Sequence, residues 1–221
     1  MATHYDLQEQ EQLATLKHFW DRWGLLISLV ALAVVLVLAG FSGYRYWQAR
    51  QASQAAVLYE QVRTASEQGQ LDQAAQALAS LQEAYPRTAQ ASQASLLAGA
   101  LFAREQDWAR AAQAYDWVSE KSRDAGFQAL AVLRKASLLM EQGQFDAALT
   151  ALDSFAFPQA FHGLREDRRG DVLQKMGRVD EAIAAYNAAY AALDALAPYR
   201  SVVEAKLNAL GARAGQSAAS A

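Results

Sequence analysis

One long apolar run interrupts an otherwise polar and alanine-rich chain of 221 residues. Residues 23–44 contain no Asp, Glu, Lys or Arg, and Arg22 and Arg45 flank them. At a helical rise of about 1.5 Å per residue this run reaches roughly 33 Å, which matches the hydrocarbon layer of a bilayer. Its side chains are apolar on every face, whereas a core helix of a soluble domain this size has a polar stripe. The pattern predicts a single transmembrane helix over residues 23–44.

A cleaved signal peptide is the main alternative to a permanent anchor. Small residues around Val37–Ala39 resemble a cleavage site. However, the leader over residues 1–22 is long and carries more acidic than basic residues, and the apolar run continues beyond Ala39. Aromatic residues also stand at both ends of the run, where amphipathic rings settle at the two membrane interfaces. We therefore expect an uncleaved anchor.

The charges that flank the anchor do not fix its orientation. Lys17 and Arg22 precede the run and two arginines follow it closely, so the positive-inside count is tied. A short leader before a long domain is typical of a signal anchor, which favours a cytoplasmic N-terminus and an exported domain. Within the run, Ala39 and Gly43 form a small-xxx-small pair, a candidate contact for another membrane helix.

A repeated pattern follows the apolar run. It begins at Gly69, Gln106, Gly143 and Gly177, so successive copies start 37, 37 and 34 residues apart. Each copy has a large apolar residue two positions in, alanine five positions in, and leucine or tyrosine nine positions in, which places these residues on one helix face. They are, copy by copy, Leu71, Ala74 and Leu78; Trp108, Ala111 and Tyr115; Phe145, Ala148 and Leu152; Val179, Ala182 and Tyr186.

Another helix is predicted before each of these turns. The residue seven positions before the start is small in three copies, at Gly99, Ala136 and Gly170. Small residues let two helices cross closely, and the large residue after the turn fills the space between them. Helix, turn and helix in about 34 residues is the pattern of a tetratricopeptide repeat. We predict an all-α fold, in which the transmembrane helix is followed by an α-solenoid of about four such pairs over residues 45–210, with a degenerate first pair.

The connecting segments agree with this organisation. Pro86, Pro158 and Pro198 fall where second helices should end, because proline cannot continue a helix interior. A polar turn over residues 122–126 ends the second pair instead. The small, polar residues 211–221 are predicted to form a disordered tail.

Composition and candidate chemistry argue against catalysis. The chain has no cysteine, and its net charge of −3 gives no reason to expect nucleic acid as a partner. His4 and His18 fall in the leader, and His162 stands alone near a turn with only Glu166 at helical spacing. No phosphate-binding glycine loop and no nucleophile with a nearby base can be recognised. We predict a protein that is not an enzyme and uses no metal, cofactor or small-molecule substrate.

Three segments carry a family resemblance: YDLQEQEQLATLKHFWDRWG from Tyr5, the anchor ending in GYRYW, and RRGDVLQKMGRVDEAIAAY from Arg168. Over residues 5–210 the chain resembles the YfgM-type family of ancillary SecYEG translocon subunits. The resemblance implies a single-pass protein of the bacterial inner membrane, with a cytoplasmic N-terminus and a periplasmic repeat domain. It also implies association with the SecYEG channel and with a membrane-anchored periplasmic chaperone of the prolyl-isomerase type. Family members are further reported to bear on stress-response regulation.

A repeat domain of this kind works through its surface. The first helix of each pair is expected to line the concave side of the stack, where a partner's segment can make many weak contacts. Apolar side chains, a methionine and charges of both signs suit an adaptable protein partner, although a merely solvated face is the alternative for each residue. The predicted partner-binding residues are Gln93, Leu96, Arg104, Leu133, Ser137, Met140, Glu141, Asp167, Asp171 and Lys175.

Two functions remain open from the sequence. The first is an ancillary subunit of the export channel, whose repeats hold chaperones or exported polypeptides near the channel exit. The second is a structural scaffold in another envelope assembly, such as cell division or outer-membrane biogenesis. The repeats alone fit both functions, and the family resemblance favours the first.

Overall fold

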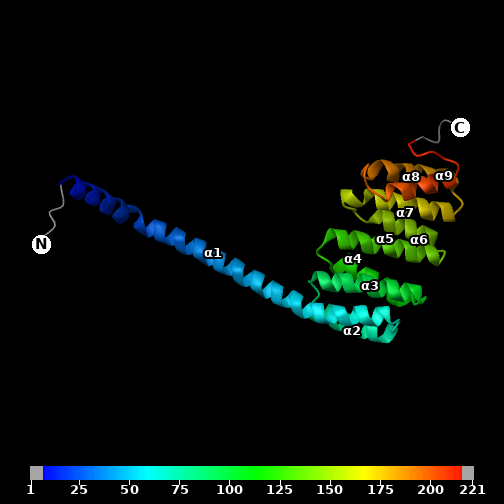
Figure 1. Cartoon of the computed structure of the whole chain (residues 1–221), viewed down its shortest axis with the longest axis horizontal. Helices are drawn as coiled ribbons and strands as arrows, with labels where there is room; N and C mark the ends of the chain where they lie inside the picture. Colours follow the sequence, from blue (N-terminus) through cyan, green and yellow to red (C-terminus); the bar gives the residue numbers. More distant parts are fainter. Residues whose placement is uncertain (1–6, 216–221) are drawn as a thin grey trace. The chain divides into compact units, whose positions relative to one another are not determined.

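The computed structural model describes residues 7–215. Every regular element in this part of the chain is a helix, which confirms the predicted all-α class (Figure 1). The first helix, α1, runs from Leu7 to Glu67, so the apolar run and the first helix of the first pair belong to one uninterrupted helix. The chain divides into two compact units, Met1–Arg50 and Gln51–Ala221, and α1 contributes to both.

The second unit is a stack of helix pairs, which confirms the solenoid predicted from the repeats. The C-terminal part of α1 pairs with α2, α3 with α4, α5 with α6 and α7 with α8, and α9 follows them. Each second helix begins at the large apolar residue that the pattern placed two positions after the turn. The bounds are α2 Leu71–Ala84, α3 Ala89–Arg104, α4 Trp108–Lys121, α5 Ala125–Glu141, α6 Phe145–Ser154, the short 3-10 helix η1 Gln159–Phe161, α7 His162–Lys175, α8 Val179–Ala192 and α9 Arg200–Ala209.

The turn inside every pair has the same left-handed geometry. Gly69, Gln106, Gly143 and Gly177 have φ angles of 68°, 60°, 73° and 76°. The amide of the residue after each of them donates to the carbonyl five positions earlier at 2.8–3.0 Å, which closes the preceding helix. Gln106 is the only member of this set with a side chain, and a left-handed residue with a Cβ costs about 1–2 kcal/mol.

Small residues in the first helices match large residues in the second helices. A Cβ on Gly99 would lie 2.5 Å from Cε1 of Tyr115, and one on Gly170 would lie 2.5 Å from Cε1 of Tyr186. Glycine is therefore required wherever tyrosine crosses it. Where the second helix carries leucine, the first helix carries valine or alanine. These pairs are Val62 with Leu78 and Ala136 with Leu152.

The connections between pairs lie where the sequence predicted them. Pro86 and Pro158 follow α2 and α6, and Pro198 stands between α8 and α9. In the turn over residues 122–126, Asp124 caps α5 by accepting hydrogen bonds from two amides of its first turn at 2.7 and 3.1 Å. The stack is thus divided into pairs by proline and by a capping carboxylate.

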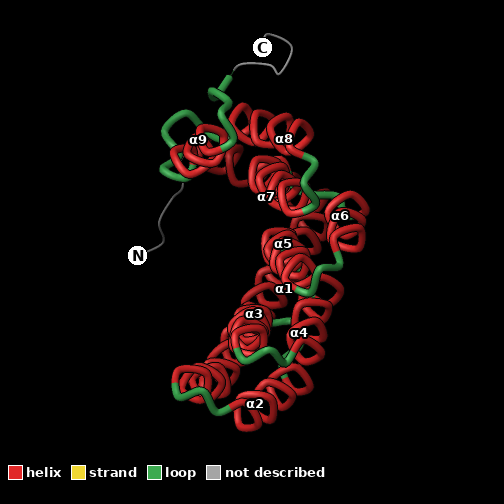
Figure 2. Tube along the Cα trace, turned by 90° about the vertical axis from the view of Figure 1, so that its right-hand side faces the viewer, coloured by secondary structure: helices red, strands yellow, loops and turns green. Residues whose placement is uncertain are grey.

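The stack of helix pairs is curved. Figure 2 shows α3, α5, α7 and α9 along the inner side of the arc, and α2, α4, α6 and α8 along the outer side. After α9, Gly211 repeats the left-handed turn with a φ of 77°, and the amide of Gly215 donates to Oδ1 of Asn187 at 3.0 Å. Residues 211–215 thus lie against the last helices, and the remainder of the predicted tail lies outside the described residues.

Candidate partner-binding surfaces

The apolar run of α1 is an exposed surface in the first unit. Within the described residues, one helix is long and apolar enough to cross a membrane, and its most apolar 18-residue window has a mean hydropathy of 2.8. Aromatic side chains at both ends are exposed, including Trp20, Trp23 and Tyr46, and the Tyr44 and Trp47 ring centroids lie 6.2 Å apart. Apolar surface of this extent favours lipid as its environment.

The small-residue pair of this helix is open. Ala39 and Gly43 are both exposed, and a Cβ added to Gly43 would meet no neighbouring atom within 4 Å. Another helix can therefore approach the backbone closely at this point. The contact of this face with a membrane helix stays a prediction.

A groove of about 330 Å³, the inner groove, lies between α3 and α5, two of the helices along the inner side of the arc. Three of the predicted partner-binding residues line it, namely Arg104, Ser137 and Glu141. Tyr115 of α4 and Arg134 of α5 line it as well. Side chains from two consecutive pairs therefore meet in one concave surface.

The groove carries charges of both signs beside a neutral phenol. Nη1 of Arg134 donates to the carbonyl oxygen of Leu96 at 2.8 Å, which fixes this guanidinium across the α3–α5 contact. Burial raises the pKa of the Tyr115 hydroxyl, so this group stays protonated at neutral pH. Arg104 pairs with Glu105 at 3.0 Å, but its side chain is 63% exposed, so the pair holds the guanidinium only weakly. The groove can thus bind a polar segment of another protein by charge and hydrogen bonding.

The other predicted residues on α3 and α5, and Lys175 on α7, lie elsewhere. Leu96 and Leu133 are buried in the core, with 4% and 6% exposure, so no partner can touch them unless the helices separate. Met140 is half-buried and packs against the core cluster around α5 and α6. Gln93 and Lys175 are exposed but do not line the groove.

The two predicted aspartates of α7 take part in an internal polar cluster. Asp167 is 1% exposed and receives hydrogen bonds from Nζ of Lys206 at 2.7 and 2.9 Å and from the Tyr199 hydroxyl at 2.7 Å. Lys206 also donates to Asp171 at 2.6 Å, and Asp171 accepts from the Tyr186 hydroxyl at 2.8 Å. Burial and the adjacent carboxylates raise the pKa of both tyrosines above its usual range. These aspartates fasten α9 to α7 and α8.

The two histidines that the structure describes lie on different helices. His162 is exposed on α7, and its Nε2 lies 3.1 Å from the carbonyl oxygen of Phe157. His18 is exposed on α1, and His4 lies outside the described residues. In the part of the chain that the structure describes, no group of three or more His, Cys, Asp or Glu side chains is arranged to hold a metal ion.

The sequence did not predict two sets of residues in these sites. Arg134 lies three residues before Ser137 and seven before Glu141, so helical spacing was a usable signal for its place in the groove. Tyr199 and Lys206, the partners of Asp167, are 32 and 39 residues away from it. No spacing rule connects positions that far apart.

Comparisons with known proteins bear on both the anchor and the stack. A family profile described as a tetratricopeptide repeat-like domain matches residues 17–212. The chain is 34% identical over 215 residues to a protein of Neisseria gonorrhoeae named "Ancillary SecYEG translocon subunit", covering 95% of this chain and 100% of the relative. Proteins of the same name from Haemophilus influenzae and Aggregatibacter actinomycetemcomitans are 26% and 25% identical, over 76% and 93% of this chain and 81% and 99% of theirs.

These similarities cover the same parts of the chain as the structural features. The family profile spans the apolar run and the helix pairs together, and the gonococcal relative is matched over its whole length. The apolar helix and the family together support an inner-membrane anchor. The chain therefore belongs to the family of ancillary SecYEG translocon subunits, with one apolar helix followed by a tetratricopeptide repeat-like domain.

Proposed function

We propose that the protein is a non-enzymatic interaction protein, anchored in the bacterial inner membrane beside the SecYEG channel. Family membership supports the association with the channel, and the apolar helix supports the anchor. The main support for a role in binding is the groove between α3 and α5, which Arg104, Ser137 and Glu141 line together. Its mixed charges fit a protein partner better than a small apolar ligand.

The proposal places the N-terminus in the cytoplasm and the repeat domain in the periplasm. A short leader followed by an anchor and a long domain supports this orientation, because such domains are translocated largely regardless of charge. A phosphatase reporter fused after Ala221 tests it. Active phosphatase is expected, and inactive phosphatase from a stable fusion contradicts the orientation.

The groove partner in this proposal is the membrane-anchored periplasmic chaperone of the prolyl-isomerase type that the family resemblance implies. Arg104 and Arg134 offer guanidinium groups to acidic side chains of that partner, and Glu141 offers a carboxylate to a basic one. The protein thereby holds the chaperone close to polypeptides that leave the channel. Any effect on a stress response follows from these contacts.

Photo-crosslinking in intact membranes tests the groove. Ala100 is exposed and lines the groove, whereas Ala147 is exposed on the outer helix α6, so the two form a matched pair for a photoreactive amino acid. A crosslink to the chaperone from position 100 and none from position 147 is expected. Equal crosslinking from both positions, or crosslinking from 147 alone, contradicts the proposal.

A third photoreactive position, at Ala39, examines the small-residue face of the anchor. This face is open, so a crosslink to a channel subunit is the expected result. Purification of the full-length protein in mild detergent then decides between the channel and another envelope assembly. Recovery of division or outer-membrane machinery without channel subunits rejects the proposed function.

A further inference from the structure

A second groove lies in the first helix pair, between α1 and α2, and no other pair contributes to it. Its volume is about 760 Å³, within the range of ligand pockets, roughly 300–1,000 Å³. All of its lining residues belong to the last turns of α1, to α2 and to the turn between them. The groove is therefore a property of the first pair alone, and it is separate from the groove between α3 and α5.

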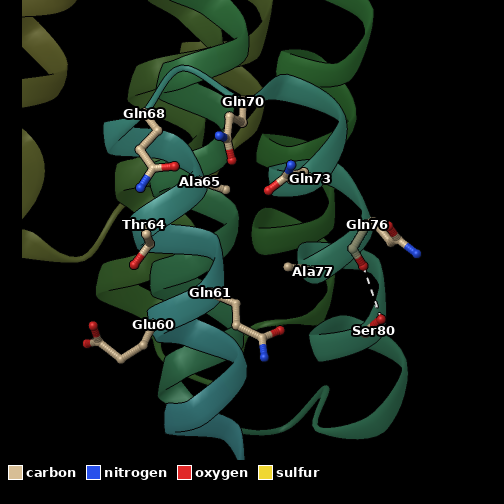
Figure 3. A pocket seen from close by; sticks show the side chains of 10 residues that line it. All are labelled: Glu60, Gln61, Thr64, Ala65, Gln68, Gln70, Gln73, Gln76, Ala77 and Ser80. Carbon is tan, nitrogen blue, oxygen red and sulfur yellow. Dashed lines mark hydrogen bonds between the residues drawn. The ribbon is translucent and has the colours of Figure 1, made fainter.

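Glutamine dominates this groove. Gln61, Gln68, Gln70, Gln73 and Gln76 line it, and none of their side-chain amides makes a hydrogen bond to another of the described residues. Figure 3 shows Gln61, Gln70 and Gln73 directed toward the space between the two helices. The single dashed bond there joins Oγ of Ser80 to the backbone carbonyl of Gln76 at 3.0 Å. The groove thus presents unpaired amide donors and acceptors to whatever enters it.

The small residues at the base of the groove allow close approach. Ala65 is 5% exposed and Ala77 is half-buried, so only methyl groups of these residues stand between Gln61 of α1 and Gln73 of α2, whereas Gln68 and Gln76 point away from this space (Figure 3). The one charged lining residue, Glu60, is at the edge and is paired with Arg63 at 2.6 Å. A surface that served only solubility would be expected to carry unpaired charges, whereas this one is lined by neutral amides.

The chemistry of a glutamine side chain specifies the ligand class. A primary amide donates and accepts hydrogen bonds, so it is complementary to the peptide group. In folded proteins the main-chain amides are already paired, and they are accessible only in an extended or unfolded segment. From Gln70 to Ser80 the groove extends about 15 Å along α2, the length of roughly four or five extended residues.

We propose that the groove between α1 and α2, through Gln61, Gln70 and Gln73, binds a short extended segment of unfolded polypeptide by its main-chain amides. Recognition by neutral amides depends little on the side chains of the segment, so one groove serves many different polypeptides. The proposal rests on the proposed function only in taking exported chains as the source of the segment. The binding itself is independent of the channel and of the chaperone.

Titration with a defined peptide tests this. The full-length protein in lipid nanodiscs is titrated into a fluorescent, uncharged, unstructured peptide of about ten residues, long enough to cover the groove. A second peptide of the same sequence carries N-methyl groups on its main chain and lacks those donors. The wild-type protein is expected to bind the first peptide and to bind the methylated one roughly tenfold more weakly.

Matched protein variants locate the site. Gln61→Ala with Gln73→Ala removes two groove amides while keeping good helix formers, and about tenfold weaker peptide binding is expected. Gln113→Ala with Gln159→Ala removes two exposed glutamines from α4 and η1, and unchanged binding is expected. Undetectable binding to the wild type, equal binding of the methylated peptide, or equal binding by the groove variant overturns the proposal.

A third variant separates this proposal from the proposed function. Arg104→Ala with Glu141→Ala alters the inner groove and is expected to lose the chaperone while binding the peptide like the wild type. Loss of the peptide in the Gln61 and Gln73 variant with retention of the chaperone is the converse result. Peptide binding therefore tests the groove between α1 and α2, and chaperone binding independently tests the groove between α3 and α5.

Discussion

The first and last helix pairs differ in whether their polar side chains have hydrogen-bonding partners. In the first pair, neutral glutamine side chains line an open groove and form no hydrogen bonds to other residues that the structure describes. In the last pair, Asp167 is buried and fully engaged by Tyr199 and Lys206, so α9 is fixed across the end of the stack. Terminal repeats need polar outer faces. The polar groups of the last pair thus form hydrogen bonds within the protein, whereas those of the first pair remain available to a ligand.

Removal of the Lys206 charge from the last pair is expected to have the largest effect on stability. In Lys206→Met the buried Asp167 loses its counter-charge, and breaking a buried ion pair in this way costs about 3–5 kcal/mol. The control is Lys135→Met, whose partner Asp116 is 39% exposed, and a loss below about 1 kcal/mol is expected there. Thermal unfolding in detergent and hydrogen exchange of α9 measure both. Equal losses in the two variants contradict the role assigned to the cluster.

A smaller loss of stability is expected when a larger residue replaces the glycine at the point where α7 and α8 cross. In Gly170→Ala the new Cβ meets the Tyr186 ring, and overpacking of this kind costs about 1–3 kcal/mol. Because Tyr186 also bonds to Asp171, the displacement extends into the polar cluster. Adding Tyr186→Leu to Gly170→Ala recreates the alanine–leucine pair found between α5 and α6 and tests whether the ring is the obstacle. If Gly170→Ala unfolds at the wild-type temperature, the proposed matching of residue sizes is wrong.

Alkaline pH is expected to weaken the last pair. Burial raises the folded-state pKa of Tyr186 and Tyr199, whereas tyrosine in an unfolded chain titrates near 10. Their stabilisation is therefore complete below about pH 10 and declines above it by up to about 1.4 kcal/mol per pH unit for each tyrosine, because only the unfolded chain releases the proton. Unfolding between about pH 9 and pH 11 measures this slope. Tyr199→Phe should flatten it, and an unchanged slope excludes Tyr199 as its source.

The smallest expected effect concerns the turns, which are alike in all four pairs. Gln106 has a φ of 60° where the other turns have glycine, so Gln106→Gly relieves backbone strain. After the entropy that glycine adds to the unfolded chain, a gain of about 0.5–1 kcal/mol remains. Thermal unfolding is the measurement, with Gln113→Gly inside α4 as a control that should destabilise by about 1 kcal/mol. A loss of stability in Gln106→Gly contradicts the assigned strain.

The helices were predictable because their signals are local. Trp108, Ala111 and Tyr115 kept the second copy aligned even though Gln106 replaces its glycine. The inner groove was predictable in part, since Arg104, Ser137 and Glu141 follow from helix faces. Leu96 and Leu133 are buried instead, because periodicity gives the direction of a face but not how much of it the adjacent pair covers.

The remaining features depend on contacts that no local pattern encodes. The partners of Asp167 are Lys206 of α9 and Tyr199 directly before it. The repeat alignment did not include this segment, since no second helix follows α9 in the described residues to complete the pattern. The glutamines of the first groove are ordinary helix formers in the sequence. They line a groove because, among the described residues, no further helix pair covers that side of α1 and α2.

The left-handed turn at Gly211 makes the length of the domain adjustable. The amide of Ala212 donates to the carbonyl of Leu207 at 3.0 Å, the same closure that elsewhere leads directly into a second helix. Up to residue 215, the last that the structure describes, the stack reaches halfway through a fifth unit, with Arg213 at the position that starts a second helix in the other four. Exchanging the residues after 211 for an amphipathic helix that begins with a large apolar residue would add a full repeat, so evolution or an engineer can lengthen the solenoid without altering any residue before it.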